Sequence, residues 1–373
     1  MVRRRIRLDD IPHGAALPCD LYSATGAVVL RINTVLRNDA EWRQLVDTGL
    51  FMDLRLQRRL EPPSVRACLA QSISLLDQVY AAPEPGAGVA GAVNRVVSLI
   101  NAGWARSKDV MIACVMLARE PTTPARHAIH TACFVQAVMH SMGLDDRLRQ
   151  AVLAAALTLH LPELAAAPDD GSMVARIADH AGNLPTRLQA LGIQDANWLA
   201  VLEYATLAMR TEYRQRTTDT LVIAGQLVAL ADLYCERIAR PEDEYAGNSR
   251  SVLRDLLIER GQHFDALLAS HFIRALGVYP VGSVVLLRSG EIGVVCNQSD
   301  QIDAPWVCSL IAPLGTPIDP PKLCDTREPA DNIRASLGPT DLLGEVDLDA
   351  IWGEAAREFC FTCLDASEVV ENE

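Results

Sequence analysis

Three side chains near the middle of the chain could do metal chemistry if folding brought them together: His127, His160 and Asp232. Neutral imidazole nitrogen and carboxylate oxygen together suit iron, manganese or zinc. Two histidines and one aspartate leave coordination positions open for water and a phosphate oxygen, which metal-assisted hydrolysis of a phosphodiester requires. Because the three residues lie far apart in the sequence, the elements that carry them decide whether they meet.

The first histidine belongs to a predicted helix at residues 126–142. On this helix His127 shares a face with Phe134 and Val138, whereas His140 lies on the opposite side. We therefore expect His127 to face the core and His140 to face solvent. Taken alone, His127 also has a simpler interpretation as a hydrogen-bonded core residue.

The second histidine ends a predicted helix at residues 146–160, which is apolar nearly all round from Ala151 to Leu159. Such a pattern is typical of a helix buried at the centre of a domain. His160 lies at the C-terminal end of this helix, where a positive side chain can also act as a simple cap.

The aspartate lies on a third predicted helix, residues 221–240, in a stripe of otherwise small or apolar residues. Burying an ionised carboxylate without a partner is costly, so Asp232 is expected to pair with a cation. That cation is an arginine, a protonated histidine or a metal. Convergence of His127, His160 and Asp232 would form a site for a single divalent metal, iron or manganese.

The composition of the 373-residue chain favours packed helices. Half of the residues are hydrophobic, but only 5% are aromatic, which is unlike a β-sandwich. A chain of this length is expected to form two or three domains. The net charge of −13 argues against nucleic acid as a partner, because phosphate neutralisation needs a clustered excess of Lys and Arg.

Hydropathy and cysteine usage point to a cytoplasmic protein without a membrane span. No apolar signal segment follows Met1, and the longest apolar runs are too short to cross a bilayer. The ten cysteines lack the spacing of a disulfide framework, so we expect reduced thiols. The close pair Cys360 and Cys363 has no second pair to complete a zinc site.

The pattern along the chain predicts a mainly α protein with a smaller part at each end. A small α/β domain is expected at residues 1–60, a helical domain at 61–278, and a β-rich extension with a terminal helix and an acidic tail at 279–373. The first part should hold strands near residues 5–8, 16–20, 28–31 and 51–56 and one short helix. The last part should hold a hairpin of residues 284–287 and 292–296, a strand at 306–310 and a helix at 347–359.

The order of these features resembles the HD-GYP family across residues 106–295. His127 matches the family's opening histidine, residues 155–163 resemble its Ala-Ala-Leu-Leu-His-Asp-Ile-Gly-Lys motif, and residues 231–235 are similar to Ala-Asp-x-Tyr-Asp. The most specific match is Leu-Gly-Val-Tyr-Pro-Val-Gly-Ser at residues 276–283. The resemblance implies an HD-GYP-like helical bundle of the cyclic-di-GMP phosphodiesterase type.

The motifs also depart from that family. Leu161 stands where the family has the metal-bridging aspartate, Thr123 replaces an upstream glutamate ligand, and residues 209–213 replace the Gly-Tyr-Pro loop. The ligands that survive the comparison are His127, His160, His180 and Asp232, with Glu203 as a substitute near the family's paired histidines. His180 also has a simpler interpretation as a packed residue. Glu203 has a simpler interpretation as a surface residue that pairs with Arg210.

These departures predict a degenerate HD-GYP-type signalling protein that is non-catalytic and binds a protein partner or cyclic di-GMP. No metal, or a single iron or manganese, is expected, and a homodimer is compatible with this prediction. The alternative is an active mono-metal phosphohydrolase built on His127, His160 and Asp232. A third alternative makes the helical domain a support for a functional domain at residues 1–60. Metal content separates the first two, and removal of residues 1–60 tests the third.

Overall fold

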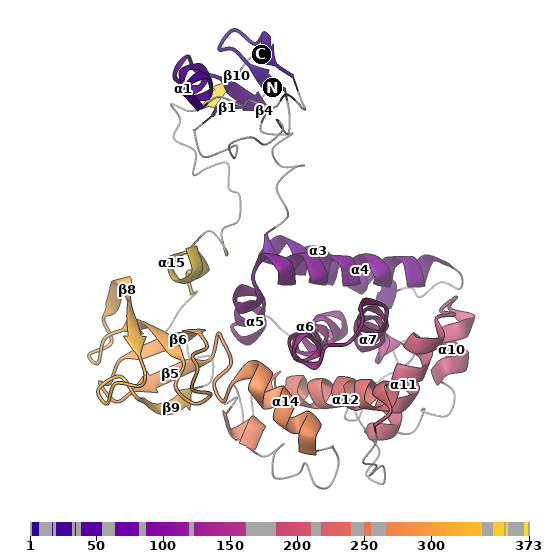
Figure 1. Cartoon of the computed structure of the whole chain (residues 1–373). Helices are drawn as coiled ribbons and strands as arrows, with labels where there is room; N and C mark the ends of the chain where they lie inside the picture. Colours follow the sequence, from indigo (N-terminus) through magenta and orange to yellow (C-terminus); the bar gives the residue numbers. More distant parts are fainter. Residues whose placement is uncertain are drawn as a thin grey trace. The chain divides into compact units, whose positions relative to one another are not determined.

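The computed structural model (Figure 1) divides the chain into two compact units, Met1–Pro63 with Glu358–Glu373, and Ser64–Arg357. Each unit is described by itself. The structure describes residues 2–6, 17, 20–31, 34, 39–53, 64–81, 87–118, 123–161, 184–209, 218–239, 250–254, 266–337, 346–353, 356 and 369–371. The predicted boundaries at residues 60 and 278 define three domains, whereas this division gives two compact units. The three domains therefore stay a prediction.

The first unit contains a five-stranded antiparallel sheet in the order β10-β1-β4-β2-β3. Its elements are β1 (Val2–Arg5), β2 (Leu21–Tyr22), β3 (Val28–Leu30), α1 (Asp39–Asp47), β4 (Phe51–Asp53) and β10 (Val369–Glu371). The acidic tail, predicted as part of the C-terminal extension, pairs through β10 with β1. This pairing joins the two ends of the chain and has no local sequence signal.

Of the segments predicted as strands at 5–8 and 16–20, the structure describes residues 5, 6, 17 and 20, and Arg5 among them ends β1. Ile6 and Leu17, in the segments predicted as strands at 5–8 and 16–20, are both buried. Each donates a single backbone hydrogen bond, to Leu50 and Thr34 respectively. The apolar pattern therefore identified core positions, and the hydrogen bond from Ile6 to Leu50 continues the pairing of β1 with β4.

The second unit has a helical part in three layers (Figure 1). Helices α6 and α7 run between a layer that contains α3 and α4 and a layer that contains α11, α12 and α14. The helices are α3 (Val65–Ala81), α4 (Ala87–Arg106), α5 (Lys108–Met116), α6 (Pro124–Met142), α7 (Asp146–Thr158), α10 (Leu184–Ala190), α11 (Ala196–Ala208), α12 (Thr220–Ala239) and α14 (Ala266–Leu276). The mainly helical fold is thus confirmed.

Local signals explain the bounds of the central helices. Thr123 caps α6 by accepting a hydrogen bond from the Arg126 backbone, and Gly143 ends this helix with a positive φ of 65°. Helix α7 is buried from Ala151 to Thr158, as its apolar run predicts. It ends two residues earlier than predicted.

A glycine lets two of these helices approach closely. A Cβ atom at Gly225 of α12 would lie 2.4 Å from the Cβ of Tyr204 on α11, which is too close for any larger residue without a shift. The contact fixes α12, and hence its other side chains, against α11.

The C-terminal part of the second unit is a five-stranded antiparallel sheet in the order β8-β7-β6-β5-β9. Its strands are β5 (Val284–Leu287), β6 (Ile292–Asn297), β7 (Trp306–Ile311), β8 (Pro317–Asp325) and β9 (Ile333–Leu337). The predicted hairpin and third strand are present. Strand β8 was not predicted because it contains three prolines, which an edge strand tolerates.

Helix α15 lies at the start of the predicted terminal helix. Helix α15 spans Leu348–Trp352, and residues 354, 355 and 357–359 of the predicted helix lie outside the described residues. The Trp352 indole donates a hydrogen bond to the Cys296 carbonyl at 2.9 Å, which ties α15 to β6. None of the helices in the described ranges combines the length and apolar character that crossing a membrane demands.

Candidate metal site

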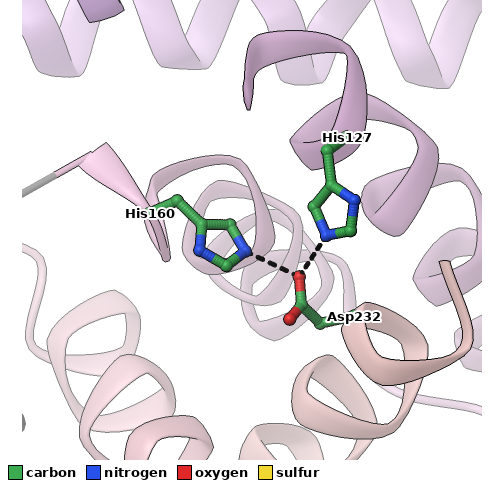
Figure 2. Close-up of side chains that lie close together, drawn as sticks. All are labelled: His127, His160 and Asp232. Carbon is green, nitrogen blue, oxygen red and sulfur yellow. Dashed lines mark hydrogen bonds and ion pairs between the residues drawn. The ribbon is translucent and has the colours of Figure 1, made fainter. Parts of the chain in front are cut away.

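The structure brings His127, His160 and Asp232 together from three separate elements (Figure 2). His127 lies in the first turn of α6, His160 in the turn that follows α7, and Asp232 near the middle of α12. Nε2 of His127 lies 2.8 Å from Oδ1 of Asp232, and Nε2 of His160 lies 2.7 Å from the same oxygen. Figure 2 shows both imidazoles pointing at this oxygen. Their ring centroids are 5.3 Å apart.

The cluster is almost completely covered. Only 7% of His127 and 1% each of His160 and Asp232 is exposed. Burial alone raises the pKa of the Asp232 carboxyl, but His160 and His127 outweigh burial and hold this pKa below its usual value. Asp232 is therefore an ionised carboxylate whose charge is met by imidazoles, with the Thr131 hydroxyl at 3.5 Å as a further donor.

The donor set fits one divalent metal. The three potential ligand atoms all lie within 4.8 Å of one another. Neighbouring ligand atoms around a first-row metal with bonds of about 2.1 Å are separated by about 3 Å, close to the observed nitrogen–oxygen distances. A metal ion bound here would take the place of the two hydrogen bonds, because both Nε2 atoms and Oδ1 would become its ligands.

The remaining predicted ligands do not join this cluster within the described residues. Glu203 is exposed on α11, and its carbonyl accepts a hydrogen bond from the Thr206 hydroxyl. His180 and Arg210 lie outside the described residues, so their predicted roles stay predictions. His140 is exposed, as its helical face predicts.

Leu161 and Thr123, which stand where the HD-GYP resemblance implies metal ligands, have structural roles. Leu161 is completely buried in the main hydrophobic cluster. Thr123 caps α6, and its hydroxyl lies 3.5 Å from a carboxylate oxygen of Asp77 on α3. Neither side chain offers the carboxylate that the resemblance implies at its position.

Two hydrogen bonds next to the cluster were not predicted. The Tyr80 hydroxyl on α3 donates to the Leu157 carbonyl at 2.8 Å, and the Trp198 indole on α11 donates to the Thr158 hydroxyl at 2.9 Å. Both donors stand at ordinary apolar positions of amphipathic helices. Periodicity shows that such a side chain is buried, but not which helix end its polar atom meets.

A second group of metal-ligating residue types lies in the C-terminal sheet: Glu291, Cys324 and Asp331. Here a lysine is already present, because Lys322 Nζ lies 3.1 Å from Glu291 and 4.0 Å from Asp331. The Cys324 thiol is 3.8 Å from Glu291. A lysine that neutralises the carboxylates explains this group without a metal.

A groove of about 980 Å³ lies beside α6, lined by parts of α3, α5 and α6 and by Val346 and Leu348. Helix α6 contributes Arg126, Ile129 and His130 to it, and α3 contributes Arg66 among others. Its volume is that of a pocket for a small ligand.

Comparison with known proteins gives one sequence match and one structural match. No protein-family model matches the chain. Eighty residues are 30% identical to cyclic di-GMP phosphodiesterase PA4108 of Pseudomonas aeruginosa, and the match spans 21% of this chain and 19% of that relative. An HDG"Y"P protein from Bdellovibrio bacteriovorus aligns with 72% of this chain and 98% of its own at 12% identity, with a TM-score of 0.43. The sequence match spans about a fifth of each chain, so the similarity to that phosphodiesterase is local.

Proposed function

We propose that this protein is a degenerate HD-GYP-type signalling protein that does not hydrolyse cyclic di-GMP and acts by binding a protein partner or the dinucleotide. The observation that carries the proposal is the burial of Leu161 in the hydrophobic core. The resemblance puts the metal-bridging carboxylate at this position. Without it, two metals cannot share a bridge and clamp the attacking and leaving oxygens of a phosphodiester.

Thr123 supports the same conclusion independently. Its hydroxyl is occupied as the N-cap of α6 and approaches Asp77, so it serves helix α6 and not a metal. Leu161 and Thr123 thus stabilise the fold at two positions where the resemblance implies metal ligands.

The residues that survive would hold at most one metal ion, iron or manganese, through His127, His160 and Asp232. When bound, such an ion supplies positive charge and Lewis acidity. Without it, the same three side chains form a buried hydrogen-bonded cluster that links α6, the turn after α7 and α12.

The dinucleotide branch of the proposal has a candidate location in the groove beside α6. Arg66 and Arg126 line it, and guanidinium groups suit phosphate oxygens. Apolar side chains such as Leu69 and Ile73 line it as well, as expected for a pocket that also covers bases. In this branch Arg66→Gln weakens binding of cyclic di-GMP in titration calorimetry.

The second candidate function is that of an active mono-metal phosphohydrolase. It is favoured by the convergence of three ligand atoms on one point and by the named activity of the Pseudomonas relative. In this case His127, His160 and Asp232 would hold the metal that the reaction requires.

Hydrolysis assays with metal analysis separate the two functions. The full chain, purified without chelators, is incubated with cyclic di-GMP and with added Mn²⁺ or Fe²⁺, and the products are resolved by chromatography. We expect no turnover, and at most one metal per chain by elemental analysis. Turnover that disappears in His160→Ala would establish the phosphohydrolase instead.

A further inference from the structure

The residue that most needs external support in the cluster is His160. His127 and Asp232 lie inside helices, whereas His160 lies in a turn just beyond the end of α7. Helix ends fray, because the last carbonyls of a helix run out of donors within it. A ligand or ion-pair partner in such a turn keeps its position only if other groups hold the turn.

Two helices hold the last turn of α7, directly before His160. The Tyr80 hydroxyl of α3 donates to the carbonyl of Leu157, three residues before His160. The Trp198 indole of α11 donates to the hydroxyl of Thr158, two residues before His160.

The acceptor Thr158 is itself oriented and fully buried. Its hydroxyl donates to the Ala154 carbonyl at 2.8 Å, so its remaining lone pairs face the indole of Trp198. Tyr80 is only 8% exposed and Trp198 only 3%. Water cannot replace a lost hydrogen-bond partner at such burial, so loss of either hydrogen bond leaves a buried polar group unsatisfied.

We propose that Tyr80, Thr158 and Trp198 are positioning residues: they fix the end of α7 so that Nε2 of His160 stays on Oδ1 of Asp232. The proposal rests on the proposed role of His160 in the cluster and adds three residues that carry no ligand atom. Groups that orient a ligand from outside a metal site typically change metal affinity by about 10- to 100-fold.

The raised pKa of the Tyr80 hydroxyl keeps it a hydrogen-bond donor. Burial, reinforced by the charge of Asp232, raises the pKa of the Tyr80 hydroxyl above its usual value. The hydroxyl therefore keeps its proton, and with it the hydrogen bond to Leu157, throughout the neutral pH range.

The test uses substitutions that remove single hydrogen bonds and a control that removes an equivalent oxygen elsewhere. Tyr80→Phe deletes one hydroxyl, and Thr158→Val replaces a hydroxyl with a methyl group of similar size. Tyr234→Phe is the control, because the buried Tyr234 hydroxyl has no hydrogen-bond partner in the described part of the chain. Thr158→Ser keeps the hydroxyl and should restore what Thr158→Val loses.

The first measurement is Mn²⁺ binding to the full chain, by electron paramagnetic resonance of the free ion. We expect Tyr80→Phe and Thr158→Val to weaken affinity about tenfold, and Tyr234→Phe and Thr158→Ser to stay within about twofold of the wild type. A loss in Tyr234→Phe as large as in Tyr80→Phe would show a general effect of stability and overturn the proposal.

The second measurement does not depend on a metal, so it separates this inference from the proposed function. Hydrogen–deuterium exchange of peptides that cover His160 is followed in the metal-free chain by mass spectrometry. We expect faster exchange in Tyr80→Phe and Thr158→Val, and wild-type exchange in Tyr234→Phe and Thr158→Ser. A wild type that binds no Mn²⁺ removes the metal site but leaves this result decisive. Unchanged exchange in Tyr80→Phe overturns the positioning role, whatever Thr158→Val does.

Discussion

Two clusters in the described residues gather three metal-ligating side chains each, and they differ in burial and in the cation that accompanies them. In the helical part, Asp232 is 1% exposed and its charge is met by two histidines. In the C-terminal sheet, Glu291 is met by Lys322, whose side chain is 49% exposed. In the first cluster the carboxylate is partnered by imidazoles, which carry a charge only when protonated, and in the second by a lysine.

This difference predicts different energetics for similar residues. A buried carboxylate deprived of its partner keeps its desolvation cost, which water cannot relieve. A partly exposed carboxylate turns to solvent instead, so its ion pair contributes little. The cluster of His127, His160 and Asp232 should therefore respond strongly to changes of charge, and the cluster around Glu291 weakly.

The largest effect is expected for a new carboxylate next to the buried cluster. Leu161→Asp removes a buried apolar side chain and adds a charge that has no partner of its own. We expect it to lower the free energy of unfolding by roughly 4 kcal/mol, measured by urea denaturation. Leu153→Asp, an equally buried position on α7, is the control.

Added Mn²⁺ sharpens this test. If the site is degenerate as proposed, Mn²⁺ restores neither variant. Recovery of Leu161→Asp alone, with more metal bound than in the wild type, would mean that the other ligands of a metal site at this position are still in place.

A somewhat smaller effect is expected from removing the carboxylate of the cluster. Asp232→Ala leaves His127 and His160 without their shared acceptor, and we expect a loss of about 3 kcal/mol in urea denaturation. The same change at Asp331, which lies 4.0 Å from Lys322 in the sheet, should cost less than about 1 kcal/mol. Equal losses at both positions would remove the distinction between the clusters.

The dependence on pH follows from the lowered pKa of Asp232. Because this pKa is lower in the folded than in the unfolded chain, the unfolded chain binds the proton more readily. The stabilisation by Asp232 is therefore fully present above its unfolded pKa of about 4 and declines as the pH falls below it. The difference in unfolding free energy between the wild type and Asp232→Asn should shrink from pH 6 to pH 3. A constant difference would show that the carboxylate is not ionised in the folded chain.

The helices that carry the cluster could be predicted because their signals are local. The run from Ala151 to Thr158 and the lone Asp232 on an apolar stripe need only the periodicity of a helix. The hairpin of β5 and β6 was equally local, since its turn residues lie between two apolar runs.

What could not be predicted depends on contacts between distant segments. Strand β10 pairs with β1 from the opposite end of the chain, and no property of either segment specifies that partner. The bonds of Tyr80 and Trp198 to the end of α7 likewise depend on how α3 and α11 pack against it. Patterns of burial locate these side chains in the core but leave their polar partners open.

The smallest effect is expected in the sheet, where it tests whether the lysine is what separates the two clusters. Lys322→Met removes the permanent cation beside Glu291 and Asp331, and the stability of this partly exposed group should change by less than about 1 kcal/mol. The two carboxylates then lie beside the Cys324 thiol without a positive charge, and the thiol is the ligand of this set that suits a soft divalent ion. We expect weak Cd²⁺ binding in Lys322→Met, seen as ultraviolet absorbance of the cadmium–thiolate bond. This absorbance should be absent in the wild type and in Lys322→Met with Cys324→Ser. Equal absorbance in the wild type would mean that Lys322 does not exclude a metal, and that burial alone distinguishes the cluster around Asp232.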